Sequence, residues 1–347
     1  LVGSEMCIRD SIWGALLEVD SNNEVKKLFL VVHHFIIDGM SWRIIFEELT
    51  EFEEDHTENI STENIASISN ALAKKIADAK LDPYWDIYIN SYRNTVYDEI
   101  PYSEVSNSLS FNLMLNESDT DNFLYLIKHQ WRMNLEQILT LICINAISHI
   151  HSNKSFAIGV ERHGRDQYTT QGIDEIIGWF TAMYCFICPT SSDVRDSATL
   201  IKNQFNQINE LNSDWLIAST IQPNLIIYKP QVLINWLGNF DSSFSDHSYL
   251  APLKIDVGNQ IDPVNSRTSL LDVTGLIKNR SLNISISVDR NFIDSSQLDT
   301  LRENFLSAIK LISTENTSIL RSNLNASNFP WIPKEKENIF NEISSSK

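Results

Sequence analysis

The chain has 347 residues, of which 43% are hydrophobic, so it can bury the core of one large domain or of two smaller lobes. Its net charge of −18 argues against nucleic acid and membrane surfaces as partners, because phosphate groups are bound by concentrated lysine and arginine. The sequence contains no apolar run long enough to span a membrane and no legible signal peptide, so we expect a cytosolic protein.

The first part of the chain opens with a β-prone run. We predict a central strand over Val25–His34, where β-branched and apolar residues dominate. A helix is predicted over Ser41–Glu54, with Ser41 as its N-cap, because apolar residues recur there at helical spacing. Residues 61–92 are polar and helix-prone, and residues 97–108 form a weak connector.

The rest of the chain alternates strands and helices. Further strands are predicted at Ser110–Asn116, Ser155–Glu161, Gln231–Leu237, Ser269–Leu276 and Ser281–Val288. Helices are predicted at Asp119–Lys128, Asn134–His149, Thr199–Leu211 and Asp294–Ile312. Interleaving of this kind is typical of an α/β fold, and we expect two lobes with a boundary near residue 108.

The chain is therefore divided into three parts. We predict a partial N-terminal lobe over residues 1–108, a C-terminal lobe over residues 109–330, and a charged linker or tail over residues 331–347. Residues 1–10 read like translated sequencing adapter and are set aside. Because Leu1 is not a starting methionine, we expect the chain to be a fragment.

Two of the four cysteines, Cys185 and Cys188, form a lone CxxC in an apolar, strand-like run. A zinc site would need two more ligands at suitable spacing, and the sequence offers none. We therefore predict two buried thiols and no metal site.

A pair of histidines follows the predicted central strand, in the sequence HHFIIDG at residues 33–39. Neighbouring strand residues point to opposite faces, so one of His33 and His34 should face a cleft and the other the packing side. Asp38 is placed to orient the loop through a charge pair, and Gly39 can take a positive φ in the turn. A lone histidine is most often structural, whereas the whole pattern at a strand end favours a catalytic site.

A second group of ionisable residues follows another predicted strand, in the sequence GVERHGRD at residues 159–166. Glu161 stands at the tip of the strand, and His163 and Arg165 lie in the loop beyond it. A glutamate in such a position can have a shifted pKa and act as a base. A solvated turn is the alternative interpretation, and these residues alone leave both open.

Two aromatic motifs occur further along the chain. They are IGWFT at residues 177–181 and INWLGNF at residues 234–240, and the second contains Asn235 and Trp236. Taken in isolation, each motif indicates core packing.

In combination these motifs point to one family. The segment HHFIIDGMSWRII resembles the signature of the condensation-domain superfamily of nonribosomal peptide synthetases, and its SWRI continuation resembles the epimerization branch. VERHGRD is similar to the VEGHGRE motif of that branch, IGWFTAMY to VGWFTxxYP, and INWLGNFD to FNYLGQFD. The motifs occur in the family's order, over roughly residues 25–315.

The resemblance implies a two-lobed fold related to chloramphenicol acetyltransferase, here with an incomplete N-terminal lobe, and a tunnel that admits a phosphopantetheine arm from each side. It implies that His34 and Glu161 move protons at the Cα of an aminoacyl or peptidyl thioester, which converts the L to the D epimer. Supporting residues would be His33, Asp38, Gly39, His163, Arg165, Asn235 and Trp236.

The same resemblance implies the partners. The domain itself would bind no cofactor, because the substrate is carried on the phosphopantetheine of an upstream peptidyl or aminoacyl carrier domain. A downstream condensation domain is a further expected partner.

Inversion requires one group to remove the Cα proton and another to return a proton on the opposite face. Histidine and glutamate on opposing walls meet that need.

Three features depart from the family pattern. Only about thirty residues precede His33, so we expect much of the N-terminal lobe to be missing. A glycine-rich PxxGxGYG motif is expected around Asn212–Ile217, where the chain reads NSDWLI. Trp236 replaces the tyrosine of FNYLG and has no phenolic O–H. Two other functions therefore stay open: a condensation domain that forms amide bonds, and a degenerate module that only docks a carrier domain.

Overall fold

The computed structural model describes residues 13–22, 24–51, 68–70, 73–74, 76, 82–95, 103–150, 155–167, 173–211, 214–241, 253, 258 and 261–314. The predicted tail over residues 331–347 and the suspect residues 1–10 lie outside these ranges. None of the helices in the described ranges is long and apolar enough to cross a membrane.

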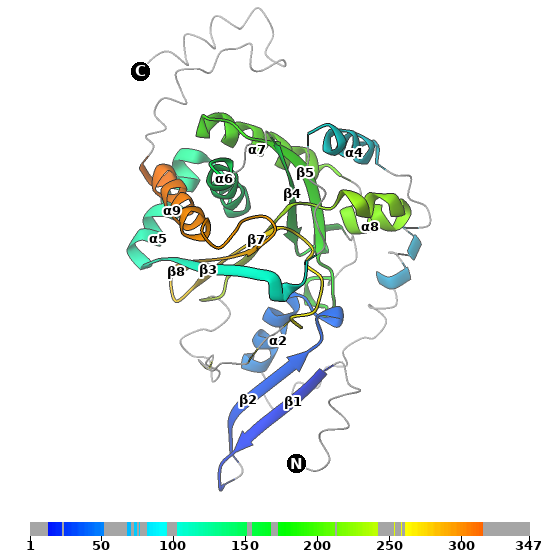
Figure 1. Ribbon diagram of the computed structural model, residues 1–347. Coiled ribbons are helices and arrows are strands. Elements are labelled where there is room, and N and C mark those ends of the chain that lie inside the picture. Colours follow the sequence, from blue (N-terminus) through cyan, green and yellow to red (C-terminus); the bar gives the residue numbers. More distant parts are fainter. Residues whose placement is uncertain are drawn as a thin grey trace, which may run out of the picture.

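A six-stranded sheet forms the centre of the molecule (Figure 1). Its strands are β3 (Ser108–Leu115), β4 (Ser155–Arg162), β5 (Ala182–Pro189), β6 (Val232–Asn239), β7 (Leu271–Lys278) and β8 (Ser281–Asp289). Their spatial order is β3-β8-β7-β6-β4-β5, with β4, β6 and β7 parallel and the other neighbours antiparallel. The five strands predicted after residue 108 are confirmed, and their ends shift by at most two residues.

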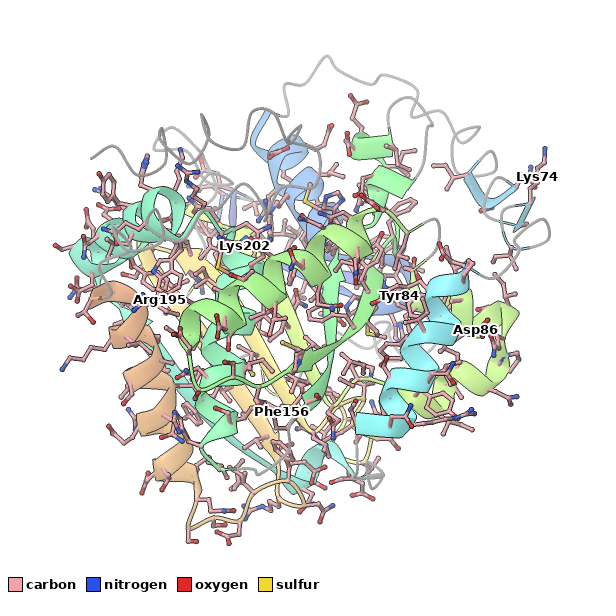
Figure 2. The ribbon with its side chains drawn as sticks, turned by 90° about the horizontal axis from the view of Figure 1, so that it is seen from above. Lys74, Tyr84, Asp86, Phe156, Arg195 and Lys202 are labelled. Carbon is pink, nitrogen blue, oxygen red and sulfur yellow. The ribbon has the colours of Figure 1, made fainter. Side chains whose placement is uncertain are left out.

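Helices cover both faces of this sheet (Figures 1 and 2). One layer consists of α5 (Glu117–Leu126), α6 (Leu135–Ser148), α7 (Val194–Asn209) and α9 (Leu298–Thr314), and α4 (Pro83–Thr95) and α8 (Trp215–Ile221) pack on the opposite face. The alternation of β4 explains the two layers, since Ile158 and Val160 join the larger core while Ala157 joins the smaller core around Trp85.

Short helical turns connect these elements. They are η1 (His34–Ile36), η2 (Val105–Asn107), the π-helical η3 (Ile127–Trp131), η4 (Arg165–Gln167), η5 (Ile173–Glu175) and η6 (Pro223–Tyr228).

The N-terminal part begins with a two-stranded ribbon. β1 (Trp13–Val19) pairs antiparallel with β2 (Val25–Val32), and the ribbon extends away from the main sheet (Figure 1). The prediction of a central strand over Val25–His34 is therefore wrong in two respects. Within the described residues β2 has a single neighbour, and it ends at Val32, before the paired histidines.

Helix α2 (Gly39–Glu51) follows the ribbon and begins two residues earlier than predicted. Asp38 caps this helix in place of Ser41, because the Asp38 Oδ1 accepts the backbone N–H of Ser41 at 2.8 Å. Gly39 is the first helical residue and has no positive φ, so that prediction is wrong as well.

Capping side chains explain where other helices begin. At α6, Asn134 and Gln137 exchange backbone and side-chain hydrogen bonds in a capping box, which confirms the predicted start. Helix α7 starts five residues earlier than predicted, at Val194, because Asp193 caps it. Helix α9 starts later than predicted, because the carboxylate of Asp294 accepts backbone N–H groups in a separate turn ahead of it.

The cysteines of the CxxC pair are packing residues. Cys185 and Cys188 are free and fully buried on β5, as is Cys143 on α6. The interpretation of the pair as two buried thiols is confirmed. Among the described residues, no three His, Cys, Asp or Glu side chains gather as metal ligands would.

Candidate active site

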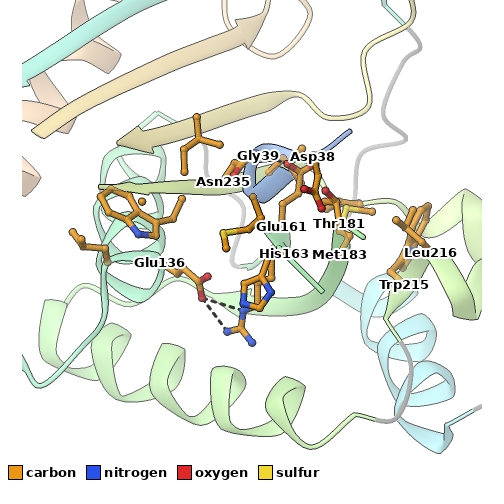
Figure 3. Close-up of a pocket in the computed structure, with 18 of the residues that line it drawn as sticks. Asp38, Gly39, Glu136, Glu161, His163, Thr181, Met183, Trp215, Leu216 and Asn235 are labelled. Atoms are coloured by element: carbon orange, nitrogen blue, oxygen red, sulfur yellow. Dashed lines mark hydrogen bonds and ion pairs between the residues drawn. The ribbon is translucent and has the colours of Figure 1, made fainter. Parts of the chain in front are cut away.

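A cavity of about 1320 Å³ lies between α2 and the ends of the parallel strands β4 and β6 (Figure 3). Its walls also include the first turn of α6, the β4–β5 connection and α8. The sequence-predicted residues that line it are His34, Asp38, Gly39, Glu161, His163, Asn235 and Trp236. His33 and Arg165 do not line the cavity but support residues that do.

His34 enters the cavity from the turn after β2. Its Nδ1 lies 2.8 Å from the carbonyl oxygen of Ile37. A carbonyl oxygen only accepts hydrogen bonds, so Nδ1 donates to it and Nε2 is not needed for this contact. The ring meets Trp179 edge-on, with centroids 6.2 Å apart. This histidine is therefore oriented to exchange a proton through Nε2.

His33 has a different task. Its Nδ1 accepts the backbone N–H of Phe35 at 3.1 Å, which caps the short turn that holds His34. The two histidines do separate into one that lines the cavity and one that does not, but strand alternation is not the reason. The strand has already ended, and the helical turn places the side chains.

Asp38 and Arg165 form a buried ion pair beneath the cavity. Arg165 donates to both carboxylate oxygens, at 2.7 and 3.2 Å, and the two side chains are 2% and 0% exposed. Burial by itself would raise the pKa of Asp38, but the hydrogen bonds from Arg165 and Ser41 outweigh it and hold this pKa below its ordinary value. Asp38 is thus an ionised structural anion whose oxygens are fully engaged.

The ion pair also binds the loop between β4 and β5. The hydroxyl of Ser41 donates to Asp38, the N–H of Gly178 donates to Ser41, and the N–H of Phe180 donates to Asp38. Gly164 allows this approach, because its φ is +66° and a Cβ there would clash with the carbonyl oxygen of Phe180. Three motifs that are distant in sequence therefore meet in one hydrogen-bond network.

Glu161 lies at the end of β4, in register with Asn235 on β6. The side-chain amide of Asn235 donates to the Glu161 Oε2 at 2.6 Å. Burial raises the pKa of Glu161, the carboxylate of Asp272 raises it further, and His34 opposes the shift. This glutamate is thus a stronger base than a solvated one, and among the described residues no hydrogen bond is made by its other oxygen, Oε1.

Asp272 is a residue that the sequence analysis missed. It lies on β7 and pairs with Arg267 at 2.6 Å, and the hydroxyl of Ser269 donates to its other oxygen. In register, Asp272 stands opposite Leu233 on β6, two residues before Asn235, so it shares a sheet face with Asn235 and Glu161. A lone aspartate in an alternating strand carries no sequence signal for such a role.

The fourth motif contacts α2 through Arg43. Arg43 donates to the carbonyl oxygen of Leu237 at 2.6 Å and lies over the ring of Phe240. Gly238 makes room for it, since its φ is +88° and a Cβ there would clash with the Arg43 guanidinium. Trp236 lines the cavity just before this bulge in the β6–β7 pairing.

A further polar group lies along the same wall. Glu136, in the first turn of α6, pairs with Arg162 at 3.0 Å, and His163 is drawn beside them (Figure 3). The Nδ1 of His163 accepts the N–H of Arg165 at 3.2 Å. Of these three residues, only His163 was predicted from the sequence to belong to the site.

The architecture and the motifs agree with a comparison against protein families. The family model described as "Condensation domain" matches residues 15–327 of this chain. The chain belongs to the condensation-domain family. Domains of this family occur in nonribosomal peptide synthetases, where they catalyse acyl transfer or epimerization on substrates carried by phosphopantetheine, and they bind no cofactor of their own.

Relatives of this condensation domain are large synthetases. Tyrocidine synthase 2 of Brevibacillus parabrevis is 23% identical over 305 residues, which cover 80% of this chain and 8% of the relative. Gramicidin S synthase 1 of Brevibacillus brevis is 25% identical over 308 residues, which cover 80% of this chain and 28% of the relative. The chain thus spans a small part of the length of the relatives it matches.

Solved structures share the fold of this condensation domain. The epimerization domain from the third module of tyrocidine synthetase B has a TM-score of 0.62 at 21% identity, covering 82% of this chain and 68% of that one. A structure concerning condensation-domain-mediated chain release from the enacyloxin polyketide synthase has a TM-score of 0.63 at 11% identity. The match covers 87% of this chain and 60% of that one. The expected α/β, chloramphenicol acetyltransferase-like fold is confirmed.

Proposed function

We propose that this condensation-family domain epimerizes the Cα of an aminoacyl or peptidyl thioester, from L to D, on the phosphopantetheine of an upstream carrier domain. The observation that supports the proposal is that His34 and Glu161 line the same cavity. The two side chains are close enough for His34 to influence the pKa of Glu161. A downstream condensation domain would receive the product.

The chemistry follows from the two groups. The thioester carbonyl delocalises the negative charge left when the Cα proton departs. Glu161, whose basicity is increased by burial, takes or returns the proton on one face, and the Nε2 of His34 does so on the other. Asn235 fixes one oxygen of Glu161, so the second oxygen faces the substrate.

The remaining predicted residues act in support. His33 shapes the turn that holds His34, and Asp38 with Arg165 fixes that turn to the loop after Glu161. Gly39 lines the cavity at a place where an added Cβ meets nothing within 4 Å. His163 and Trp236 form cavity wall.

The departures from the family pattern have structural counterparts. Asp214, in the described part of the segment NSDWLI, caps helix α8 by accepting the N–H of Ile217 at 2.9 Å, and Trp215 and Leu216 of this helix line the cavity. Trp236 occupies the place of the family's tyrosine. If a phenolic hydroxyl assists the reaction, Trp236→Tyr raises the epimerization rate, and an unchanged or lower rate assigns the position to packing.

The test is exchange of the Cα proton with deuterium in a carrier-bound aminoacyl thioester, together with chiral analysis of the released amino acid. Replacing Glu161 by glutamine keeps its shape but removes its basicity, and loss of a positioned acid–base group costs roughly 10²–10⁴-fold in rate. His34→Ala is measured beside it. Each residue serves one face, so a single variant can retain exchange while losing inversion.

Three outcomes separate the candidate functions. If the Glu161→Gln variant exchanges and inverts the Cα proton at the wild-type rates, the proposed mechanism is wrong. Amide formation with an acceptor thioester, without inversion, would identify a condensing domain. Binding of the carrier by the wild-type protein with neither reaction would identify a degenerate docking module.

A further inference from the structure

The carboxylates that line the described wall of the cavity are Asp38, Glu136 and Glu161. Asp38 uses both oxygens on Arg165 and on neighbouring donors. Glu161 is the proposed base. Glu136 is the carboxylate for which the reaction has so far supplied no role.

Glu136 lines the cavity and uses only one of its two oxygens in the described contacts. Both contacts from Arg162, through Nε and Nη2, go to the Glu136 Oε2 at 3.0 Å. Among the described residues, no donor reaches Oε1. The carboxylate is held by a partner on one side and is unsatisfied on the other, which leaves a ready hydrogen-bond acceptor.

Arg162 is locked in this position. Its Nη1 donates to the Asn209 Oδ1 at 2.6 Å, and its guanidinium lies 5.4 Å from the ring centroids of both Tyr184 and Phe205. The side chains of Arg162 and Glu136 are 16% and 17% exposed, so the pair is a built part of the wall. The similar family motif VEGHGRE has glycine at this place, so the pair distinguishes this chain.

The electrostatic balance at Glu136 favours an incoming cation. Burial raises the pKa of Glu136, and Arg162 and His163 offset this effect only in part, while Asp166 adds to it. A buried carboxylate that its partners do not fully compensate gains from a further positive charge. An ammonium group on the substrate would supply that charge and a donor for Oε1.

We propose that Glu136 is a specificity-determining residue that binds the free α-ammonium group of an aminoacyl thioester through its Oε1. This inference rests on the proposed function and narrows it to aminoacyl rather than peptidyl substrates. The ammonium nitrogen is bonded directly to the Cα on which His34 and Glu161 act, and Figure 3 shows Glu136 and Glu161 in the same pocket. A carboxylate on this wall therefore discriminates between a free and an acylated amine.

The test measures binding, so that it does not depend on catalysis. The ligands are alanyl pantetheine amide and its N-acetyl derivative, in which an amide replaces the reactive thioester. Their dissociation constants are determined by calorimetry for the whole chain, for Glu136→Gln, and for Glu303→Gln as a control on the exposed face of α9. Glutamine keeps an oxygen that can accept from Arg162, and it replaces the charged Oε1 acceptor with an uncharged NH2 donor.

Glu136→Gln should weaken binding of the free-amine ligand by roughly 10- to 100-fold, as expected for loss of a charge-assisted hydrogen bond. The N-acetyl ligand should bind wild type and variant alike, and Glu303→Gln should change neither. Equal weakening of both ligands would show that Glu136 only shapes the wall, and no weakening would show that it does not touch the amine. Either result overturns the inference while deuterium exchange still reports separately on the proposed function.

Discussion

Burial and the neighbouring carboxylate of Asp272 disfavour the charge of Glu161, and this carboxylate can be removed without touching the glutamate. Asp272 raises the pKa of Glu161, after the larger effect of burial. Since a base acts in its ionised form, activity falls as the pH drops through this pKa. Asp272→Asn removes a negative charge, lowers the pKa of Glu161, and should move the acidic limb of the pH–rate profile to lower pH.

The control for this variant is Asp299→Asn, which removes the same charge at an exposed position on α9. It should leave the profile in place. Asp272 also balances Arg267, so the melting temperature of the variant is measured first. A profile that does not move in a folded Asp272→Asn protein contradicts the electrostatic role of Asp272.

At the scale of elements, one ion pair joins α2 to the β4–β5 connection. Asp38→Ala leaves the Arg165 guanidinium buried without its anion, which should destabilise the fold by about 3–5 kcal/mol in urea unfolding. The double variant Asp38→Ala/Arg165→Met removes both charges and should be more stable than the sum of the single effects predicts. Additive single effects would mean that the pair is not coupled.

The same pair has a signature in pH. The pKa of Asp38 is depressed in the folded protein, so its contribution is present above the unfolded-state value of about 3.9 and is lost as the pH falls through the folded-state value. Wild type should therefore lose stability in this acid range, and Asp38→Ala should lose less. Parallel stability curves for the two proteins would contradict the assignment.

Two glycines offer a matched test of how α2 meets β6. Gly238→Ala combines a left-handed φ with a clash against Arg43 and should cost about 1–3 kcal/mol. Gly39→Ala adds the same methyl group where nothing lies within 4 Å and the backbone is helical, so stability should hold or rise by up to about 1 kcal/mol. Thermal unfolding measures both, and equal losses would contradict the contact with Arg43.

The elements that sequence predicted best are those whose signals are local. β7 and β8 alternate buried and partly exposed residues over most of their length, and their predicted ranges are confirmed within two residues. The cap of α2 was assigned wrongly because both Asp38 and Ser41 are good N-caps, and the choice depends on Arg165, more than a hundred residues away. The ion pair of Glu136 and Arg162 was missed for the same reason, since it joins a helix start to a distant strand end.

For the whole molecule, the α/β fold and the family could be predicted because several motifs occur in one order. The boundary between lobes near residue 108 stays a prediction. Placing the β1–β2 ribbon needed coordinates, since a β-prone sequence does not say how many neighbours a strand has. Roles for the site residues stay proposals that the variants above will test.

The buried free cysteines can report on unfolding of the central core through their labelling by a thiol reagent. Burial raises the pKa of the Cys188 thiol to about 12, and Cys143 and Cys185 are shifted upward by the same cause. Thiolates are the reactive form, so in a Cys7→Ser background these residues should resist a thiol reagent until the sheet unfolds. Their labelling rates should rise together along a urea titration, and early labelling of one cysteine would reveal a separately opening element.

The network of Asp38, Ser41 and Arg165 has a consequence for hybrid synthetases. One part of the network lies near residue 40 and the other lies within residues 165–180. A recombination junction between these two segments therefore combines the aspartate of one parent synthetase with the arginine of another. Even where both parents carry this aspartate and this arginine, the β4–β5 connection of one parent must pack against the α2 helix of the other. Junctions outside residues 38–180 keep this network within a single lineage and should yield functional chimeras more often.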